Sequence, residues 1–333
     1  MHPSLPLLRR SLLLALAGAG LQACGTSAPA EDGKRQASGP PSPAGPRPAP
    51  GSSVADTGSA HYRFARFDLD SADGRRHYRV QLAIPQSAPP AQGHPLLVLL
   101  DGNAAFALLT EQMLAQQAAS GRPLAIAALG YDTERSPDTT ARAFDYTPPV
   151  PGEQPTWDDA ARQRPCGGAD LFLDLLEQQL LPAIGQRVPT DAAHRTLWGH
   201  SYGGLLALYT LFTRPQLFSR YAAADPSLWW HDGFLLSVEA RAQPLPAGRR
   251  TQLLLMAGGA GTATRSERPG MGPGMQEQAR NRRAMLSDAT PRMAERQALR
   301  AGLDLRWQTF PGVGHGPMRP ASIPPTLAFA SAA

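Results

Sequence analysis

The chain has 333 residues, of which 42% are hydrophobic and 18% charged, so it can bury one sizeable core. Its net charge is +5, and nearly all the positive charge is arginine because Lys34 is the only lysine. These arginines are scattered along the chain, which argues against nucleic-acid binding and leaves an anionic small molecule as a partner that the charge would suit.

The N-terminal residues have the pattern of an export signal. Arg9 and Arg10 precede the apolar run SLLLALAGAGL, which is too short to span a bilayer and ends in LQAC at Cys24. This ending resembles the lipobox of bacterial lipoproteins, with Gln22 an imperfect match, so we predict a signal over 1–23 and acylation of Cys24. Ordinary cleavage is the alternative, and RRSLL also admits twin-arginine export. The expected location is the periplasm, with a lipid anchor as the only membrane contact.

Residues 24–60 are rich in Pro, Gly, Ser and Ala and have Val54 as their one large apolar residue. Such a segment cannot repay the entropy of ordering, so we predict a disordered tether. Apart from Cys24, the chain has one cysteine, Cys166, and its core must therefore form without disulfides if Cys24 is acylated. A nucleophilic role for Cys166 is the alternative reading, which the better nucleophile below disfavours.

From residue 61 to 333 the pattern alternates between strands and helices, which predicts one domain with a mostly parallel sheet and helices on both faces. The first two strands are expected to pair in antiparallel fashion. The expected strands are 61–69, 77–85, 94–100, 123–131, 194–201, 219–227, 251–259 and 303–312, and the expected helices are 104–119, 169–184, 203–215 and one within 275–301.

Two long segments fit neither period. Residues 132–168 and 259–275 are rich in proline or glycine, and each follows the carboxyl end of an expected strand. Loops of this length in a compact domain are usually functional or disordered, and open α/β sheets bind ligands at this edge. We therefore expect them to border the site.

The stretch WGHSYGGLLALY carries the central motif. Gly199-His200-Ser201-Tyr202-Gly203 matches G-x-S-x-G, with an expected strand before it and an apolar helix after it. In this context the serine lies on a strained strand-to-helix turn that exposes its hydroxyl, and the glycines avoid clashes around it. The motif predicts an α/β-hydrolase fold with Ser201 as nucleophile.

A serine nucleophile needs a general base, which comes last in chain order in this architecture. His315, in FPGVGHGPM after the final strand, is the predicted base. His200 is expected to point away from the nucleophile in a structural role, and His231 is a weaker competitor for the base.

An oxyanion hole needs two backbone donors aimed at the developing charge. The amide of Tyr202, directly after the nucleophile, is the first expected donor. Asn103, in LLDGN at the end of the third strand, is the expected second donor. An ordinary strand-ending turn is the alternative interpretation of Asp101-Gly102-Asn103.

The acid of a triad usually follows the seventh strand, but no carboxylate comes early there and Glu267 comes only later. Asp225, at the end of the sixth strand, is the predicted alternative, and Asp288 is a distant one. The sequence thus predicts a working Ser201 and His315 pair completed by Asp225.

Six strings in this order and spacing, LDGN, DYTPP, GGAD, LWGHSYGG, PSLWW and GHGPM, resemble the periplasmic ferric-siderophore esterases that hydrolyse enterobactin and salmochelin. That group lies within the esterase D family of α/β-hydrolases, and the resemblance covers roughly Tyr62 to Ser322. It implies Ser201 as nucleophile and His315 as base. Its salmochelin-type members are thought to use a dyad without a conventional acid, and this chain departs from them at Asp225, where serine is expected.

The resemblance implies that the substrate is a cyclic triester of serine that carries catechols, bound free or as the iron complex. We expect the enzyme to be a monomer. Lactone attack by Ser201 and hydrolysis of the acyl-enzyme are the implied steps, with no cofactor, and no metal because no His, Cys or carboxylate cluster has ligand spacing. A generic carboxylesterase or acyltransferase and a non-catalytic siderophore-binding lipoprotein are the alternatives.

The resemblance also suggests substrate-binding candidates. Arg142 matches an arginine of the group, with a solvated loop arginine as the alternative. Trp229 and Trp230 could stack on a catechol, with buried packing as the alternative for one of them. Gly167 and Gly168 could let backbone approach the ligand, or could merely start the helix at Asp170.

Overall fold

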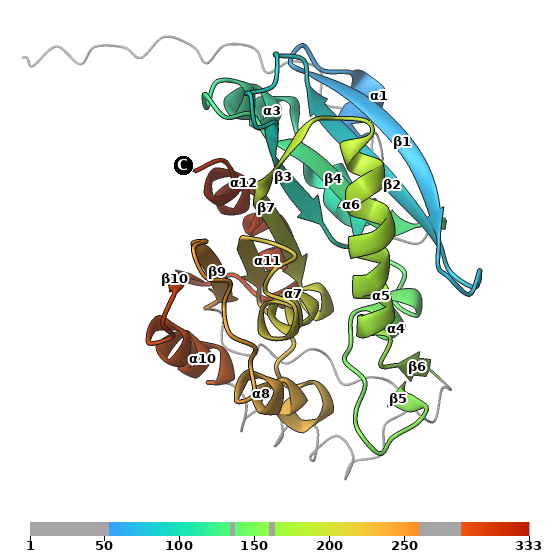
Figure 1. Cartoon of the computed structure of the whole chain (residues 1–333), viewed down its shortest axis with the longest axis vertical. Coiled ribbons are helices and arrows are strands. Elements are labelled where there is room, and N and C mark those ends of the chain that lie inside the picture. The colour runs from blue at the N-terminus through green and yellow to red at the C-terminus, as the bar shows by residue number, and fades with distance from the viewer. Residues whose placement is uncertain (1–52, 134–136, 160–163, 260–287, 333) are drawn as a thin grey trace, which may run out of the picture. The chain divides into compact units, whose positions relative to one another are not determined.

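The computed structural model describes residues 53–133, 137–159, 164–259 and 288–332, all within one compact unit that spans Pro48–Ala333. The expected signal, its acylated Cys24 and most of the expected tether lie outside the described residues. The unit is built around one eight-stranded sheet (Figure 1). No helix among the described residues is long and apolar enough to cross a membrane.

The sheet has the strand order β1-β2-β4-β3-β7-β8-β9-β10. As expected, β1 and β2 form an antiparallel pair, and β2 is antiparallel to β4. All other neighbours are parallel. This order and one reversed strand at the second position give the α/β-hydrolase topology that the sequence predicts. The strands are β1 (Tyr62–Asp70), β2 (His77–Pro85), β3 (His94–Leu99), β4 (Ala125–Tyr131), β7 (Thr190–His200), β8 (Arg220–Ala224), β9 (Thr251–Gly258) and β10 (Leu303–Phe310).

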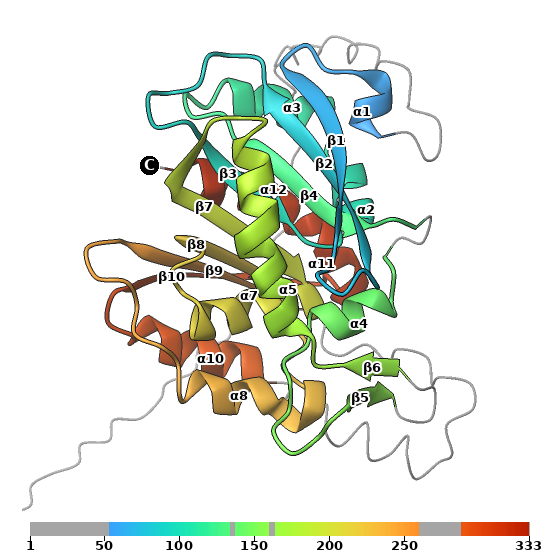
Figure 2. The ribbon, with the colours of Figure 1, turned by 45° about the vertical axis from the view of Figure 1, so that its right-hand side comes forward.

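Helices cover both faces of the sheet, as Figures 1 and 2 show. On one face, Val98 of the sheet belongs to the same hydrophobic cluster as Leu173 and Leu208 of the helices. On the other face, Leu97 shares a cluster with Leu114 and Leu327. The first face carries α5 (Ala169–Leu175), α6 (Leu181–Gly185), α7 (Tyr202–Thr213), α8 (Phe234–Glu239) and α10 (Ala289–Ala298); the second carries α3 (Glu111–Ala118), α11 (His315–Ala321) and α12 (Ile323–Ser331).

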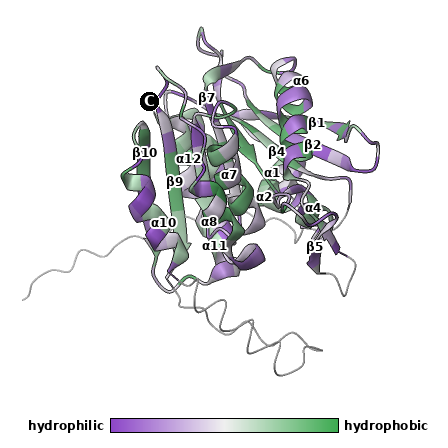
Figure 3. Ribbon diagram, turned by 60° about the horizontal axis from the view of Figure 1, so that its bottom comes forward, coloured by the Kyte–Doolittle hydropathy of each residue, from purple (hydrophilic) through white to green (hydrophobic). Residues whose placement is uncertain are grey.

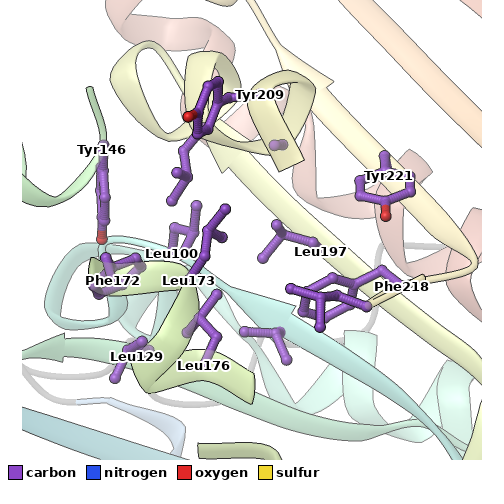
Figure 4. Packing of buried hydrophobic residues seen from close by; sticks show 14 of the residues in the cluster. Leu100, Leu129, Tyr146, Phe172, Leu173, Leu176, Leu197, Tyr209, Phe218 and Tyr221 are labelled. Carbon is purple, nitrogen blue, oxygen red and sulfur yellow. The ribbon is translucent and has the colours of Figure 1, made fainter. Parts of the chain in front are cut away.

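The central strands are buried on both faces, which explains their continuous apolar runs. Every residue of β3 and β4 is buried. In Figure 3, β9 is mostly hydrophobic while the covering helix α10 also presents hydrophilic residues. Figure 4 shows Leu197 of β7 close to Phe218 and Leu173 in the first cluster.

The expected helix 104–119 is wrong as a single element. The chain forms α2 (Gly102–Ala105) and η1 (Phe106–Leu108), then breaks at Leu109. Thr110 starts a new helix, α3, because its side chain accepts a hydrogen bond from the Met113 amide at 3.2 Å and so caps the helix. By contrast, the expected helix 169–184 is continuous, with a π-helical turn at Leu176–Leu180 between α5 and α6.

The folded domain begins earlier in the chain than the expected end of the tether at residue 60. Residues 54–57 form the short helix α1 (Val54–Thr57), in which Ser53 and Asp56 make a capping box and Val54 is buried. The single large apolar residue of that segment therefore belongs to the folded unit. Hydrophobic burial of Val54 offsets part of the entropy cost that the composition suggested would keep the segment disordered.

The long segment 132–168 contains regular structure of its own. It forms the helix α4 (Ala141–Asp145) and a two-stranded hairpin of β5 (Thr156–Asp159) and β6 (Arg164–Cys166). The second long segment, 259–275, lies almost wholly outside the described residues. Whether it borders the site stays a prediction.

Candidate active site

Ser201 lies at the turn between β7 and α7, in the strained conformation that a nucleophile elbow requires. Its φ is 62° and its ψ −116°, a conformation that a side-chain-bearing residue rarely adopts. A Cβ on Gly199 would lie 2.2 Å from the carbonyl group of Gly203, so the glycine is needed to let the strand and helix meet. The local fold that the motif predicts is confirmed.

The side chains of Ser201, His315 and Asp225 form a hydrogen-bonded chain. His315 Nε2 lies 3.1 Å from Ser201 Oγ, and His315 Nδ1 lies 2.5 Å from Asp225 Oδ2. These contacts are those of a nucleophile, a general base and a carboxylate that orients the base. The His315 side chain is 43% exposed, so the base is open to substrate.

Asp225 follows β8 and has a φ of 45°, which turns its side chain towards the base. Its amide donates to the carbonyl of Met256 at 2.8 Å, and the amide of Gly258 donates weakly to its Oδ1 at 3.4 Å. The end of β9 therefore holds the carboxylate. The predicted place of Asp225 beside His315 is confirmed.

The other two candidates for the acid do not take this position. Glu267 lies outside the described residues. Asp288 is the N-cap residue of α10 and pairs with Arg292 at 3.8 Å. Among the described carboxylates, Asp225 is the one hydrogen-bonded to His315.

Ser227 is a neighbour of the nucleophile that the sequence did not single out. Its hydroxyl lies 3.1 Å from Ser201 Oγ, and its amide donates to the carbonyl of Ser201 at 3.1 Å. Ser227 is buried. Its place two residues after Asp225 is the one sequence signal that could have pointed to it.

His200 is structural, as expected, but the expectation that it points away from the active-site face is wrong. Its Nε2 donates to the backbone carbonyl of His315 at 2.8 Å, and the two rings are 4.8 Å apart. Burial, with the neighbouring His315, lowers the pKa of His200 to about 4, so its ring is neutral near pH 7. His200 thus supports the loop that carries the base.

The two predicted oxyanion donors both lie in the first turn of a helix. Tyr202 begins α7, and Asn103 is the second residue of α2. Backbone amides at such positions have no partner within the helix. The Asn103 side chain fixes its loop to β4, because its Oδ1 accepts from the Tyr131 amide at 2.8 Å and its Nδ2 donates to the Tyr131 carbonyl at 3.0 Å. The oxyanion roles stay predictions.

Arg142, on α4, lies beside the elbow and is not a solvated loop residue. Its Nε and Nη2 donate to the two carboxylate oxygens of Asp101 at 2.8 and 2.9 Å. Its Nη2 also lies 3.3 Å from the carbonyl of His200. The guanidinium is paired within the protein, and its predicted contact with a substrate stays a prediction.

The two adjacent tryptophans have different surroundings. Trp229 is 38% exposed, and its ring centroid lies 6.0 Å from that of Tyr202. Trp230 is 2% exposed, and its indole Nε1 donates to Asp158 Oδ1 at 3.2 Å. The prediction that Trp230 contacts the substrate is therefore wrong because its ring is buried in the core, whereas the Trp229 ring is partly exposed.

The glycine pair before α5 has a structural explanation. Gly167 has a φ of 89° and donates its amide to Thr147 Oγ1 at 2.9 Å. A Cβ on Gly168 would lie 2.1 Å from the ring of Phe144. At Gly168 the prediction that a ligand approaches the backbone is therefore wrong because Phe144 fills the space, and at Gly167 it stays a prediction.

We predict that Gly168→Ala lowers the free energy of unfolding by about 1–3 kcal/mol, because the new methyl group overlaps the Phe144 ring. Denaturant unfolding monitored by circular dichroism measures the effect. Phe144→Leu in the same chain should restore part of the loss. Gly185→Ala, where a Cβ meets open space, is the matched control. An equal loss in both alanine variants would show that the Phe144 contact is not the cause.

The sequence also suggested His231 as an alternative base and Cys166 as an alternative nucleophile. His231 Nε2 lies 3.1 Å from Glu153 Oε2, so this ring is paired away from Ser201. Cys166 is buried, and burial raises the pKa of its thiol to about 12. A thiol that stays protonated at neutral pH is a poor nucleophile, which removes Cys166 as a catalytic candidate.

Two of the triad residues, together with His200, also meet the geometric requirement for a metal-binding group. His200, Asp225 and His315 each offer a ligand atom, and these atoms lie within 4.8 Å of one another. The sequence spacing that led us to expect no metal does not report this group, because the fold joins residues far apart in the chain, and the absence of a metal stays a prediction. The hydrogen bonds described above already engage all three side chains.

Known proteins share this fold. A family model described as "Putative esterase" matches residues 71–285. The chain is 34% identical to the apo-salmochelin esterase of Escherichia coli over 82% of this chain and 80% of that one. It is 28% identical to the ferri-bacillibactin esterase of Bacillus subtilis over 79% and 87% of the two chains. A solved enterobactin and salmochelin hydrolase superposes with a TM-score of 0.62 and 33% identity, covering 84% of this chain and 99% of that one.

Proposed function

This chain belongs to the esterase family whose model it matches, and from this premise we propose that it is a serine esterase that hydrolyses the ester bonds of a catecholate siderophore. The observation that carries the proposal is the hydrogen-bonded chain Ser201–His315–Asp225 on the nucleophile elbow. Two relatives are named as esterases of siderophores, and these names indicate the class of substrate.

The reaction is acyl transfer in two stages. His315 Nε2 accepts the proton of Ser201 as the hydroxyl oxygen attacks a lactone carbonyl, and Asp225 stabilises the imidazolium that forms. The amides of Tyr202 and Asn103 hold the oxyanion. The protonated His315 then gives its proton to the leaving alkoxide, and water, activated by the same ring, hydrolyses the acyl-enzyme.

The product is a linear or shortened catecholate ester. Each cut opens or shortens the cyclic triester, which weakens the preorganised hold of the siderophore on iron. Iron arrives as part of the substrate in this scheme.

Mass spectrometry of the products after incubation with a siderophore panel tests the substrate class. The panel contains enterobactin, salmochelin and bacillibactin, each with and without iron, together with short p-nitrophenyl esters. We expect linearised siderophore to form faster than p-nitrophenol. A strong preference for the short esters would contradict the siderophore proposal, and binding of intact siderophore without product would favour a binding protein instead.

The exposed Trp229 ring is the best-placed aromatic surface for a catechol. We predict that Trp229→Ala raises KM for the catecholate substrate about three- to tenfold, because a stacking contact is lost. Turnover of a short aliphatic ester should stay within twofold of the wild type. Steady-state kinetics with both substrates measures this difference, and Trp307→Ala, an exposed tryptophan on the edge strand β10, is the matched control. An equal effect on both substrates would show that Trp229 has no selective contact with the catechol.

The N-terminal sequence supports a proposal about location. From the apolar run that ends at Cys24 we propose export to the periplasm and acylation of this cysteine. We further propose that the enzyme is a monomer and that the lipid anchor is its one membrane contact. Metabolic labelling with an alkyne fatty acid should modify the wild type and leave Cys24→Ala unlabelled. Labelling of both chains would contradict acylation at Cys24, and a dimer by light scattering would contradict the monomer.

A further inference from the structure

We propose that Arg142 is a positioning residue that holds the two segments of the oxyanion hole in register, rather than a ligand for substrate charge. The inference rests on the proposed acyl transfer, and it is independent of which ester the enzyme hydrolyses. It follows from the contacts of one guanidinium with both segments.

The first segment is the loop after β3. Asp101 directly precedes Gly102 and Asn103 and receives two hydrogen bonds from Arg142, at 2.8 and 2.9 Å. A bidentate pair of this kind fixes both the distance and the orientation of the carboxylate. Arg142 therefore fixes Asp101, which lies two residues before the predicted donor Asn103.

The second segment is the nucleophile elbow. Arg142 Nη2 lies 3.3 Å from the carbonyl oxygen of His200, the residue before Ser201. The guanidinium also lies over the ring of Tyr202, 5.3 Å from its centroid. Tyr202 carries the other predicted donor amide, so one side chain contacts residues next to both amides.

The loop after β3 needs such support because its backbone is strained. Asp101 has a φ of 53°, in the left-handed region that favours glycine. Its amide donates to the hydroxyl of Tyr146 at 3.0 Å, and Arg142 also lies over that ring at 5.4 Å. Strained residues persist when their surroundings hold them, and here the contacts that hold Asp101 come from Arg142 on α4 and from Tyr146 directly after it.

Burial argues against a direct role in attracting an anionic substrate. The side chain of Arg142 is 11% exposed, and that of Asp101 is 3% exposed. The positive charge is therefore neutralised by a buried partner before any substrate arrives. A lysine could keep the charge but could not form the two parallel hydrogen bonds.

Arg142→Lys tests the proposal with two substrates of different charge, an anionic ferric catecholate and a neutral p-nitrophenyl ester. We expect kcat to fall about tenfold to a hundredfold with both substrates and KM to change less than threefold, because misplaced donors weaken transition-state binding. The rate at which a neutral organophosphonate labels Ser201 should fall by a similar factor. This last measurement needs no siderophore, so it remains decisive if the proposed substrate is wrong.

Arg214→Lys is the matched control, because Arg214 pairs with Asp174 at 2.6 Å at the far end of α7 from Ser201. It should leave kcat unchanged.

If Arg142→Lys unfolds, the double variant Arg142→Met with Asp101→Asn removes the pair without leaving one buried charge. The folded protein of this double variant should show the same loss of kcat. A loss confined to KM for the anionic substrate would overturn the proposal in favour of direct binding, and unchanged kinetics with both substrates would also overturn it.

Discussion

Ser201→Ala is expected to lower kcat by about 10⁴- to 10⁶-fold, the largest effect of any single substitution in this chain. The hydroxyl oxygen of Ser201 forms the bond to the acyl group, and Ser201 is the residue at the strained turn between β7 and α7, where φ is 62°. The remaining activity would be direct attack of water on the bound ester, assisted by substrate binding and by the oxyanion donors. Product analysis by mass spectrometry and active-site labelling with an organophosphonate measure the loss.

Ser227→Ala is the matched control for this prediction. The two hydroxyl oxygens are 3.1 Å apart, but the hydrogen bond to His315 Nε2 is made by Ser201. We expect Ser227→Ala to keep organophosphonate labelling within about tenfold of the wild type. Ser201→Ala should abolish labelling and still bind the siderophore. If labelling survives in Ser201→Ala and disappears in Ser227→Ala, the nucleophile is Ser227.

The parts of this site that were predicted from the sequence depend on local patterns. G-x-S-x-G between an apolar strand and an apolar helix specified the elbow. Gly199 is required by its close contact with Gly203 four residues later, whereas a Cβ on Gly203 would lie at an ordinary 3.5 Å from Leu100. The position of His315 followed from chain order in this architecture. The sheet was predictable for a similar reason, because buried strands such as β3 and β4 have continuous apolar runs.

The parts that were not predicted depend on contacts between distant segments. The pairing of Arg142 with Asp101 joins residues that are 41 positions apart, and the hydrogen bond from His200 to the His315 carbonyl joins residues 115 apart. No periodicity reports such contacts. The difference between Trp229 and Trp230 has the same origin, because Trp230 packs in the core and donates a hydrogen bond to Asp158, 72 positions earlier on β5.

The position of Asp225 depends partly on a local sequence pattern and partly on contacts between distant segments. It leads to the second substitution for which we expect a large loss of activity. Asp225 follows β8, one strand earlier than the usual place of the acid, yet its Oδ2 lies 2.5 Å from His315 Nδ1. A carboxylate that precedes the usual position by one strand can serve the same base because β8 and β9 are parallel neighbours whose carboxyl ends meet at one edge. The geometry therefore predicts a triad in which Asp225 acts, rather than the Ser–His dyad of the group that the sequence resembles.

We expect Asp225→Asn to lower kcat by about 10³- to 10⁴-fold. The amide of asparagine can donate to His315 Nδ1, which leaves the proton on Nε2, where the ring must accept one from Ser201. Asp225→Ser, which installs the residue that the resemblance predicts at this position, removes the carboxylate without imposing that tautomer and should lose less activity.

Steady-state kinetics with a neutral ester measures kcat for the wild type and for both variants. Asp191→Asn, which removes a carboxylate hydrogen-bonded to His194 at 2.6 Å outside the triad, is the matched control and should leave kcat unchanged. Equal turnover for wild type, Asp225→Asn and Asp225→Ser would show that His315 works without an acid. In that case the 2.5 Å contact would orient the loop between β10 and α11 and contribute nothing to proton transfer.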